Sequence, residues 1–301
     1  MNRLPFNKAG RFYKGNIHTH SNVSDGMLTP EAVCDTYRNL GYDFLSVTDH
    51  FMDQFGYKMA DTRAYRTDKF TTLIGAELHT GRTELGNLWH ILAVGLPLDF
   101  AKYPEGETGG DVSARALASG AFVAAAHPYW YILTEADILS LGDIHAIEVY
   151  NGTSADHNDK PDGWYMSDMM SMRGRLYSTC ATDDAHFFPH RADVGLGWVM
   201  VKSEELSPEA ILENLKLGNY YSSTGPTIYD VHRTGDNRLI VKCSPASRVF
   251  VTGSGWTARS AYGNGIREAE LNLKGFDSPF MRITVRDANG GRAWTSPILL
   301  E

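Results

Sequence analysis

Two histidines separated by one residue stand near the start of the chain, in the stretch HTHSNVSDG at residues 18–26. The carboxylate of Asp25 follows five positions after His20. Residues 11–17 are expected to form a short strand, on which alternate side chains point to the same side. His18 and His20 would therefore lie side by side, and neutral imidazole commonly binds borderline divalent metals such as zinc. The spacing indicates a metal site, although a lone pair of this kind is more often structural.

Further residues with metal-binding side chains stand at the ends of apolar segments that are expected to be strands. Segments 44–47, 71–76, 122–126 and 177–182 are each followed by His, Asp or Glu, and one histidine lies near the start of segment 89–94. Together with the first motif they make nine candidate metal ligands, which are His18, His20, Asp25, His50, Glu77, His90, His127, Asp184 and His186. A single zinc ion takes four or five ligands. The set therefore predicts a cluster of two or three divalent ions (zinc, manganese or iron).

Three of the nine candidates are carboxylates, which are Asp25, Glu77 and Asp184. A centre that holds two or three dications keeps a net positive charge in spite of them, so it attracts anions. Paired divalent ions also lower the pKa of a bridging water, so that hydroxide can attack at neutral pH. The chemistry indicated is metal-assisted ester hydrolysis. A structural role is the more frequent one for any single histidine, but it does not account well for nine such residues at successive strand ends.

Short apolar strands alternate with helical segments over the first two thirds of the chain. One helix is expected to begin after Thr29, which can cap it, with Pro30 at the first helical position and Gly41 closing it. Further helices are expected at 112–119, 164–172 and 207–217. The alternation predicts an α/β protein with a mainly parallel sheet. Candidate ligands at the carboxyl ends of some seven strands favour a closed or nearly closed barrel.

The pattern changes from about residue 220 to short β-type segments separated by Gly, Asn, Asp and Pro. Such a pattern is typical of a small antiparallel β-sandwich. We therefore expect a barrel domain at 1–225 that carries the metal ligands, followed by a β-rich domain at 226–301.

The composition excludes several classes of protein. Among 301 residues, 43% are hydrophobic and 21% charged, which is ordinary for a globular protein, and the net charge is −8. That charge argues against a nucleic-acid partner, because binding to phosphates relies on basic side chains. Three scattered cysteines imply no disulfide framework, no apolar run approaches the ~20 residues of a membrane span, and the first residues lack the apolar core of a signal peptide. We expect a cytoplasmic protein with a small anionic substrate.

Five motifs in order resemble those of the PHP (polymerase and histidinol phosphatase) family over about residues 12–200. They are HTHSNVSDG at 18–26, TDH at 48–50, GAE at 75–77, HP at 127–128 and DAH at 184–186. The resemblance implies a distorted (β/α)7 TIM-like barrel with a di- or trinuclear metal centre. It also implies hydrolysis of a phosphate ester, such as a small phosphorylated metabolite or nucleotide, by a metal-bridging hydroxide.

The same resemblance implies how the nine ligands are shared. One metal would be held by His18, His20, Glu77 and Asp184. Glu77 would bridge to a second metal, which His90 and His127 would also hold, and a third would lie among Asp25, His50 and His186. Asp184, His186 and Glu77 would act in catalysis through the metal-bound hydroxide. Some members of the family have histidine where this chain has Asp25.

Two alternatives to phosphate ester hydrolysis remain open. The segment GRFYKGNIHTHSNVSDG and the β-rich tail also resemble a branch of the family that includes carbamate-ester hydrolases, so the same centre could act on a carboxylic or carbamate ester. A binding module with the same fold and no activity would be expected to lack ligand residues, and none of the five motifs lacks one.

Four residues near the motifs are candidates for binding the substrate. Arg191 and His190 follow the DAH motif, and arginine suits bidentate recognition of phosphate. Trp130 follows the HP motif and could wall a pocket. His79 shares a strand face with Glu77 and could face either the substrate or the metal ligands. A surface or core role competes with each of these assignments.

Overall fold

The computed structural model describes residues 4–300 as an α/β fold built on one large mixed sheet of 16 strands. The helices are α1 (Pro30–Asn39), α2 (Gly109–Ala118), α3 (Glu135–Ser140), α4 (Gly152–His157), α5 (Trp164–Met172) and α6 (Pro208–Lys216), and short 3-10 helices cover Pro5–Asn7, Asp53–Phe55 and Arg63–Tyr65. The strands are β1 (Arg11–Asn16), β2 (Phe44–Val47), β3 (His50–Phe51), β4 (Thr71–Leu78), β5 (Ile91–Val94), β6 (Phe122–Ala125), β7 (Ala146–Asn151), β8 (Ser178–Thr182), β9 (Trp198–Ser203), β10 (Tyr220–Ser223), β11 (Ile228–Arg233), β12 (Arg238–Thr252), β13 (Ala258–Asn272), β14 (Phe280–Arg286), β15 (Arg292–Thr295) and β16 (Ile298–Leu299).

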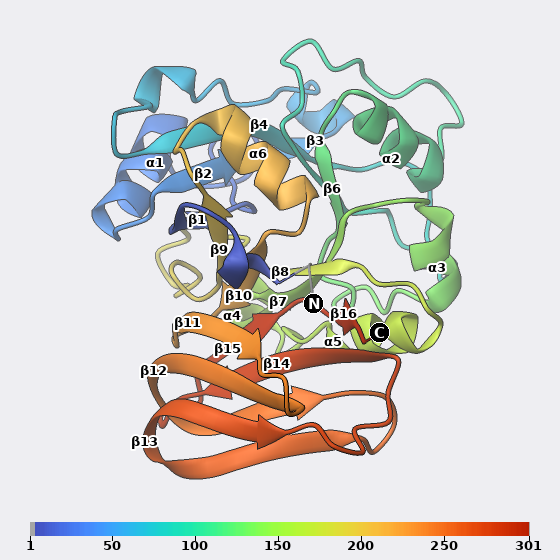
Figure 1. Ribbon diagram of the computed structural model, residues 1–301. Helices are drawn as coiled ribbons and strands as arrows, with labels where there is room; N and C mark the ends of the chain where they lie inside the picture. Colours follow the sequence, from blue (N-terminus) through green and yellow to red (C-terminus); the bar gives the residue numbers. More distant parts are fainter. Residues whose placement is uncertain (1–3, 301) are drawn as a thin grey trace.

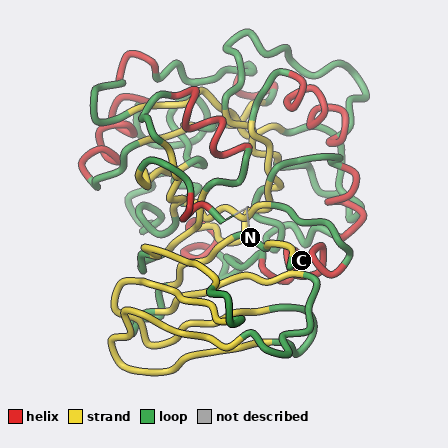
Figure 2. The backbone as a smooth tube through the Cα atoms, in the orientation of Figure 1, coloured by secondary structure: helices red, strands yellow, loops and turns green. Residues whose placement is uncertain are grey.

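The upper part of the molecule in Figure 1 contains the helices, which cover the outside of strands β1 to β9. The tube in Figure 2 shows that the lower part consists of strands and loops. Strands follow one another in the order β1-β2-β4-β5-β6-β7-β8, and this path bends round on itself. An isolated parallel bridge between Thr19 and Ala185 joins the segments that follow β1 and β8.

The sheet is mixed, and the prediction of a mainly parallel sheet is wrong around β5 and at β9, which is antiparallel to β1. Strands β1, β2 and β4 run parallel, and so do β6, β7 and β8. However, β5 is antiparallel to both of its neighbours, β4 and β6. The connection 79–90 between β4 and β5 contains no helix. Without a crossover helix, the chain returns beside the strand it has left. A regular (β/α)7 barrel is therefore not confirmed.

The helix boundaries follow local sequence signals. Thr29 caps α1 by accepting a hydrogen bond from the backbone N–H of Ala32, and Gly41 adopts a positive φ of 77° just beyond the helix, as predicted. In contrast, α4 is not among the helices that the sequence predicts. Its N-terminus is stabilised by Asn151, whose side chain accepts from the backbone N–H of Ser154.

The β-rich tail continues the same sheet instead of forming a separate one. Strand β10 pairs with β9 on one side and with β15 on the other, so the ladder runs from the upper part into the tail. The tail core includes Leu4 and Tyr221 from the preceding chain beside residues of β11 to β16. The assignment of 1–225 and 226–301 as two domains stays a prediction.

Helices that could cross a membrane are absent from residues 4–300, because none is both long and apolar enough.

Candidate metal centre

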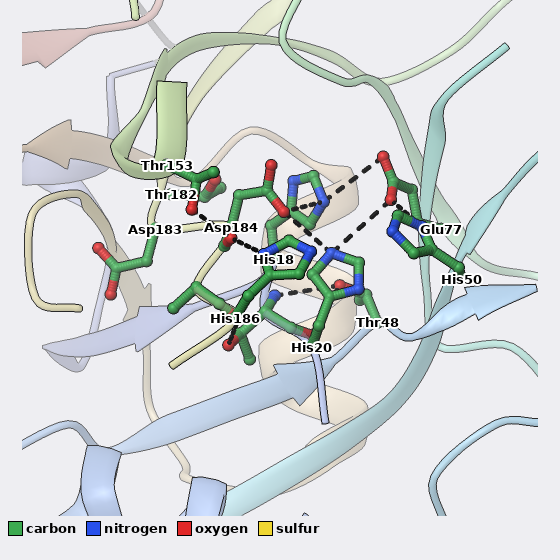
Figure 3. Close-up of polar contacts among 12 residues, drawn as sticks. His18, His20, Thr48, His50, Glu77, Thr153, Thr182, Asp183, Asp184 and His186 are labelled. Carbon is green, nitrogen blue, oxygen red and sulfur yellow. Dashed lines mark hydrogen bonds and ion pairs between the residues drawn. The ribbon is translucent and has the colours of Figure 1, made fainter. Parts of the chain in front are cut away.

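The nine predicted ligands come together at one end of the strands of the upper part, where His90 precedes the antiparallel β5 and the others follow or end parallel strands. Residues that offer a possible metal-binding atom fall into overlapping groups. In each group the metal-binding atoms, one from each residue, lie no more than 4.8 Å apart. Figure 3 shows the first motif beside the last one, with His18 and His20 facing Asp184, while Glu77 and His50 lie on the opposite side of the cluster. The segments that carry these residues are far apart in the sequence, and the bend of the sheet brings them together.

The first of the three ligand sets that the resemblance implies, with His18, His20, Glu77 and Asp184, is almost completely buried. The Oδ1 atom of Asp184 lies 2.9 Å from His20 Nε2 and 3.2 Å from His18 Nε2. The carboxylate of Glu77 completes the group, with Oε1 at 3.7 Å from His18 Nε2 and Oε2 at 3.7 Å from His20 Nε2. Four side chains thus point toward one small volume.

Glu77 also belongs to a second group. Its Oε1 atom lies 2.7 Å from His90 Nδ1 and 3.1 Å from His127 Nε2. The same carboxylate therefore touches both groups, which is the position required of a bridging ligand. His90 directly precedes β5, where it is held although the strand runs in the unexpected direction.

The third group is more open to solvent. Asp25 is 42% exposed, and its Oδ1 lies 3.5 Å from His186 Nε2 while its Oδ2 lies 3.5 Å from His50 Nε2. His20 Nδ1 lies 3.9 Å from Asp25 Oδ1, so His20 stands between the first and third groups. Solvent can therefore reach the cluster from this side.

Several polar atoms in the cluster are buried without a hydrogen bond among the described residues. They are His18 Nε2, His20 Nδ1, Glu77 Oε2 and His127 Nδ1. Burying such atoms without a partner is costly. Imidazole nitrogens and carboxylate oxygens are also the donors that zinc and manganese accept. The residues present therefore fit divalent metal ions.

The ionisation states of four candidate ligands fit metal binding, whereas neighbouring carboxylates outweigh burial and raise the pKa of His18 and the pKa of His50 above the usual range. Burial raises the pKa of Glu77, but the surrounding imidazoles, His90 first, outweigh burial and hold it well below the usual range. The same balance, with His18 first among the imidazoles, lowers the pKa of Asp184. Burial lowers the pKa of His20 to about 3, and that of His90 to about 3. Two carboxylates are thus anionic and two imidazoles neutral at pH 7, which are the forms that bind metal.

Backbone strain occurs at two of the candidate ligands. His127 has a φ of 25° and Asp184 a φ of 54°. Residues other than glycine rarely adopt such values, which persist when the surrounding structure enforces them and which cluster at functional sites. Around Asp184, the enforcing contacts include the hydrogen bond from its backbone N–H to the carbonyl of His18, at 2.8 Å.

Glu148, in β7, is a buried carboxylate that the sequence analysis missed. Its Oε1 accepts from His18 Nδ1 at 2.9 Å and from the hydroxyl of Thr182. Its Oε2 accepts from the backbone N–H of His127 at 2.6 Å and from Asn151 Nδ2 at 3.0 Å. Glu148 thus turns Nε2 of His18 toward the metal-binding volume. A carboxylate inside the apolar run 144–149 was the available signal, because a charged residue is seldom buried without a partner.

Asp49 and Asp183, the acidic residues beside the ligands, hold backbone segments. Asp49 accepts hydrogen bonds from both the backbone N–H and the hydroxyl of Ser21 and of Ser24, which fixes the loop before Asp25. The side chain of Asp183 points away from the histidines in Figure 3. It accepts from the backbone of residues 195–197.

The four predicted substrate-binding residues occupy different positions. Trp130 lies beside the cluster, with its ring 5.3 Å from that of His127. Arg191 is partly exposed, and its Nη2 donates to His157 Nδ1 at 3.1 Å; the partly exposed surface that follows the DAH motif is called the rim below. His190 is exposed, with its ring 5.8 Å from that of Phe188.

His79, the fourth of them, is buried within the cluster itself. Its Nε2 lies 3.4 Å from Glu77 Oε2 and 2.7 Å from His50 Nδ1. It is therefore placed among the ligands and away from the rim.

No family model matches the chain, and no curated protein matches it in sequence. A two-domain protein from Bacteroides vulgatus ATCC 8482, described as containing a predicted PHP-like metal-dependent phosphoesterase, has a similar structure, with a TM-score of 0.55 over 96% of both chains at 15% identity. Weaker matches cover 57% of this chain and 87% of the other. They are a provisionally assigned metal-dependent phosphoesterase from Bifidobacterium adolescentis ATCC 15703 (TM-score 0.43, 15% identity) and an amidohydrolase from Chromobacterium violaceum with bound sulfate and no metal (TM-score 0.44, 16% identity).

The match to the Bacteroides vulgatus protein is a likeness of fold. The chain therefore has a PHP-like fold, in agreement with the resemblance that the five sequence motifs carry.

Proposed function

We propose that the chain is a metal-dependent phosphoesterase that hydrolyses a small phosphorylated metabolite or nucleotide. The observation that carries the proposal is the position of Glu77. Its two carboxylate oxygens contact histidines of all three ligand groups, so one residue can join two or three metal ions in a single centre. Bound divalent ions would lower the pKa of water for attack at neutral pH and neutralise charge on the phosphoryl oxygens.

The chain's own residues supply the geometry for this reaction. Glu148 holds His18, and Asp49 holds the loop that carries Asp25, so ligands on separate strands keep fixed positions. Such preorganisation matters because the site then needs no rearrangement while charge develops in the transition state. On the open side, Asp25 and His186 border the approach to the cluster.

Recognition of an anionic substrate is assigned to the rim. Arg191 is the cation nearest to the DAH motif in sequence, and its guanidinium also lies 5.6 Å from the ring of Phe188. Guanidinium groups bind phosphate in a bidentate manner. Trp130 would form a wall against the organic part of the substrate.

The test is turnover of a panel of phosphomonoesters, including nucleotides, after loading with manganese or zinc. We expect the native chain to release phosphate. In Asp184→Ala the rate of phosphate release should fall by at least about a hundred-fold, because removing a metal ligand should cost more activity than removing a residue that only orients one. Asp99→Ala, at an exposed position outside the cluster, is the matched control and should keep full activity.

Aryl carboxylic and carbamate esters belong in the same panel. Release of alcohol from these esters, without phosphate release from any phosphoester, would favour the alternative substrate class and contradict the proposal. Normal turnover and metal content in Asp184→Ala would contradict the shared centre itself.

A further inference from the structure

His79 is the one predicted substrate-binding residue that has no access to the rim. Its side chain is 1% exposed and makes two directed contacts. On one side, Nδ1 lies 2.9 Å from the backbone carbonyl oxygen of Trp89. On the other side, Nε2 lies 2.7 Å from Nδ1 of His50, one of the candidate ligands of the third group.

These contacts assign the protons when both rings are in the neutral form that binds metal. A carbonyl oxygen only accepts hydrogen bonds, so Nδ1 of a neutral His79 carries the proton and donates it to Trp89. Nε2 of His79 then has a lone pair, so His50 must donate from its own Nδ1. The remaining nitrogen of His50, Nε2, lies 3.5 Å from Asp25 Oδ2, where a bound metal ion would take the place of a proton.

Two other histidines of the cluster follow the same rule with simpler partners. His186 donates from Nδ1 to the carbonyl oxygen of Asp184 at 2.8 Å, and His18 donates from Nδ1 to Glu148. In each case the partner of one nitrogen leaves the other nitrogen free for a metal, as is general for histidine ligands. For His50 the partner is a second histidine, and that histidine is itself oriented by a carbonyl group.

We propose that His79 is a positioning residue that sets the tautomer and orientation of His50 and so strengthens the third metal site. The inference rests on the proposed function, since it assumes that Asp25, His50 and His186 hold a metal. The proposed arrangement is a chain of two hydrogen bonds. It runs from the backbone carbonyl oxygen of Trp89 to the imidazole of His79, and from there to the imidazole of His50, which would bind the metal.

Glu77 does not make this role redundant. Its Oε2 lies 2.7 Å from His50 Nδ1 and could also accept the proton. However, the same carboxylate serves the first and second ligand groups, so bound metals would occupy its oxygens. His79 Nε2 would then be the acceptor that remains for His50. The backbone of His79 is fixed independently, because its N–H donates to the hydroxyl of Tyr103 at 2.6 Å. Side-chain variants should therefore fold.

Two isosteric variants separate the two contacts of His79. In His79→Gln, the amide lies where Nε2 was, so it can accept from His50 but cannot reach Trp89. In His79→Asn, the amide lies where Nδ1 was, so it can donate to Trp89 but cannot reach His50. His232→Asn changes an exposed histidine of β11 and is the matched control.

The readout is stepwise affinity for zinc, measured by calorimetry in competition with a chelator. We expect His79→Asn to weaken a single zinc site, the one assigned to Asp25, His50 and His186, by about 10–100-fold and to leave the other sites unchanged. This is the usual effect of losing the hydrogen-bond partner of a metal ligand. His79→Gln and His232→Asn should stay within a few-fold of the native chain. Equal loss at all sites, loss in both His79 variants, or loss in His79→Gln alone would overturn the proposal.

A second readout works on the metal-free chain and does not depend on the proposed function. Long-range nitrogen–proton NMR spectra of histidine-labelled protein distinguish the two neutral tautomers, and His79→Gln identifies the His79 signals. We expect His79 protonated on Nδ1, and an Nε2-protonated ring would overturn the inference. If the tautomer is as expected but the native chain binds no metal, the proposed function fails, and with it the role assigned to His79 at the third site.

Discussion

Residues behind the ligands decide which nitrogen of each histidine is available to a metal. His18 is held by a carboxylate and His186 by a carbonyl oxygen, and both present Nε2 to the cluster. Glu148 is connected to three of the candidate ligands. It contacts the side chain of His18 and the backbone of His127, and through Asn151 it is linked to Asp184, since Asn151 Nδ2 also donates to Asp184 Oδ2 at 3.1 Å.

Replacing Glu148 with Gln should weaken metal binding while the fold is kept. One oxygen can still accept from His18 and Thr182, but the amide NH2 would face the backbone N–H of His127, which has no other acceptor there. We expect metal affinity to fall by about 10–100-fold. Chelator competition measures it, with the exposed Glu105→Gln as control. Unchanged affinity in Glu148→Gln would contradict the orienting role.

All nine candidate ligands could be found from the sequence because their motifs are short, ordered and placed at strand ends. Glu148 could not be found in this way, since the two ligands that it contacts, His18 and His127, lie more than 20 residues from it and no motif connects them. The sequence indicated that His79 lies near the site but did not indicate its position there. Its neighbour Glu77 made either a rim or an inner position possible, and the partners of its two nitrogens resolve the question.

The loop at residues 21–25 shows how an element without regular structure is made rigid. Asp49, at the end of β2, accepts four hydrogen bonds from Ser21 and Ser24 at distances from 2.7 to 3.2 Å. Those bonds set the course of the loop, and Asp25 is the next residue. The third ligand group therefore depends on a carboxylate that is not itself a predicted ligand.

Asp49→Ala should free this loop. Four donors lose their acceptor, and unfolding free energy should fall by about 1–3 kcal/mol, the cost of leaving buried polar groups unpaired. Urea denaturation measures this change, with Ser24→Ala as a milder comparison. We also expect selective weakening of the metal site to which Asp25 would contribute. An unchanged midpoint with all metal affinities intact would show that the loop is held by other contacts.

Local sequence signals predicted the helices and strands more accurately than they predicted how the strands are arranged in the sheet. Thr29 and Gly41 mark α1 correctly, because capping depends on residues close in sequence. The direction of β5 depends on the connection 79–90 between it and β4, which contains no helix, and not on the residues of the strand itself. In α4 a buried Asn151 cap outweighs a polar, turn-rich sequence.

At the scale of the whole molecule, the upper part and the tail share both a sheet and side-chain contacts. Strand β10 pairs with β15, as in Tyr221 opposite Thr295. Arg282 on β14 makes two hydrogen bonds to Asp168 on α5, at 2.7 and 2.8 Å. Composition alone predicted where the β-rich segment starts, but it gave no sign that this segment extends the sheet of the upper part.

A chain cut after residue 225 should not fold cooperatively. The truncation would remove the partner strand of β10 and expose Tyr221, which is fully buried in the intact chain. We expect loss of a cooperative thermal transition and exposure of apolar surface, measured by circular dichroism and dye binding. A truncated chain that melts cooperatively and binds metal as the intact chain does would show that residues 1–225 are an independent domain.

The central claim is that nine residues from separate strands form one multinuclear metal centre. Elemental analysis by mass spectrometry of the intact chain, after loading with manganese or zinc and removal of free ions, tests it most directly. The account predicts two or three metal ions per chain, and fewer in His20→Ala. A native chain that retains no metal, or a single ion that is unaffected by His20→Ala, would contradict it.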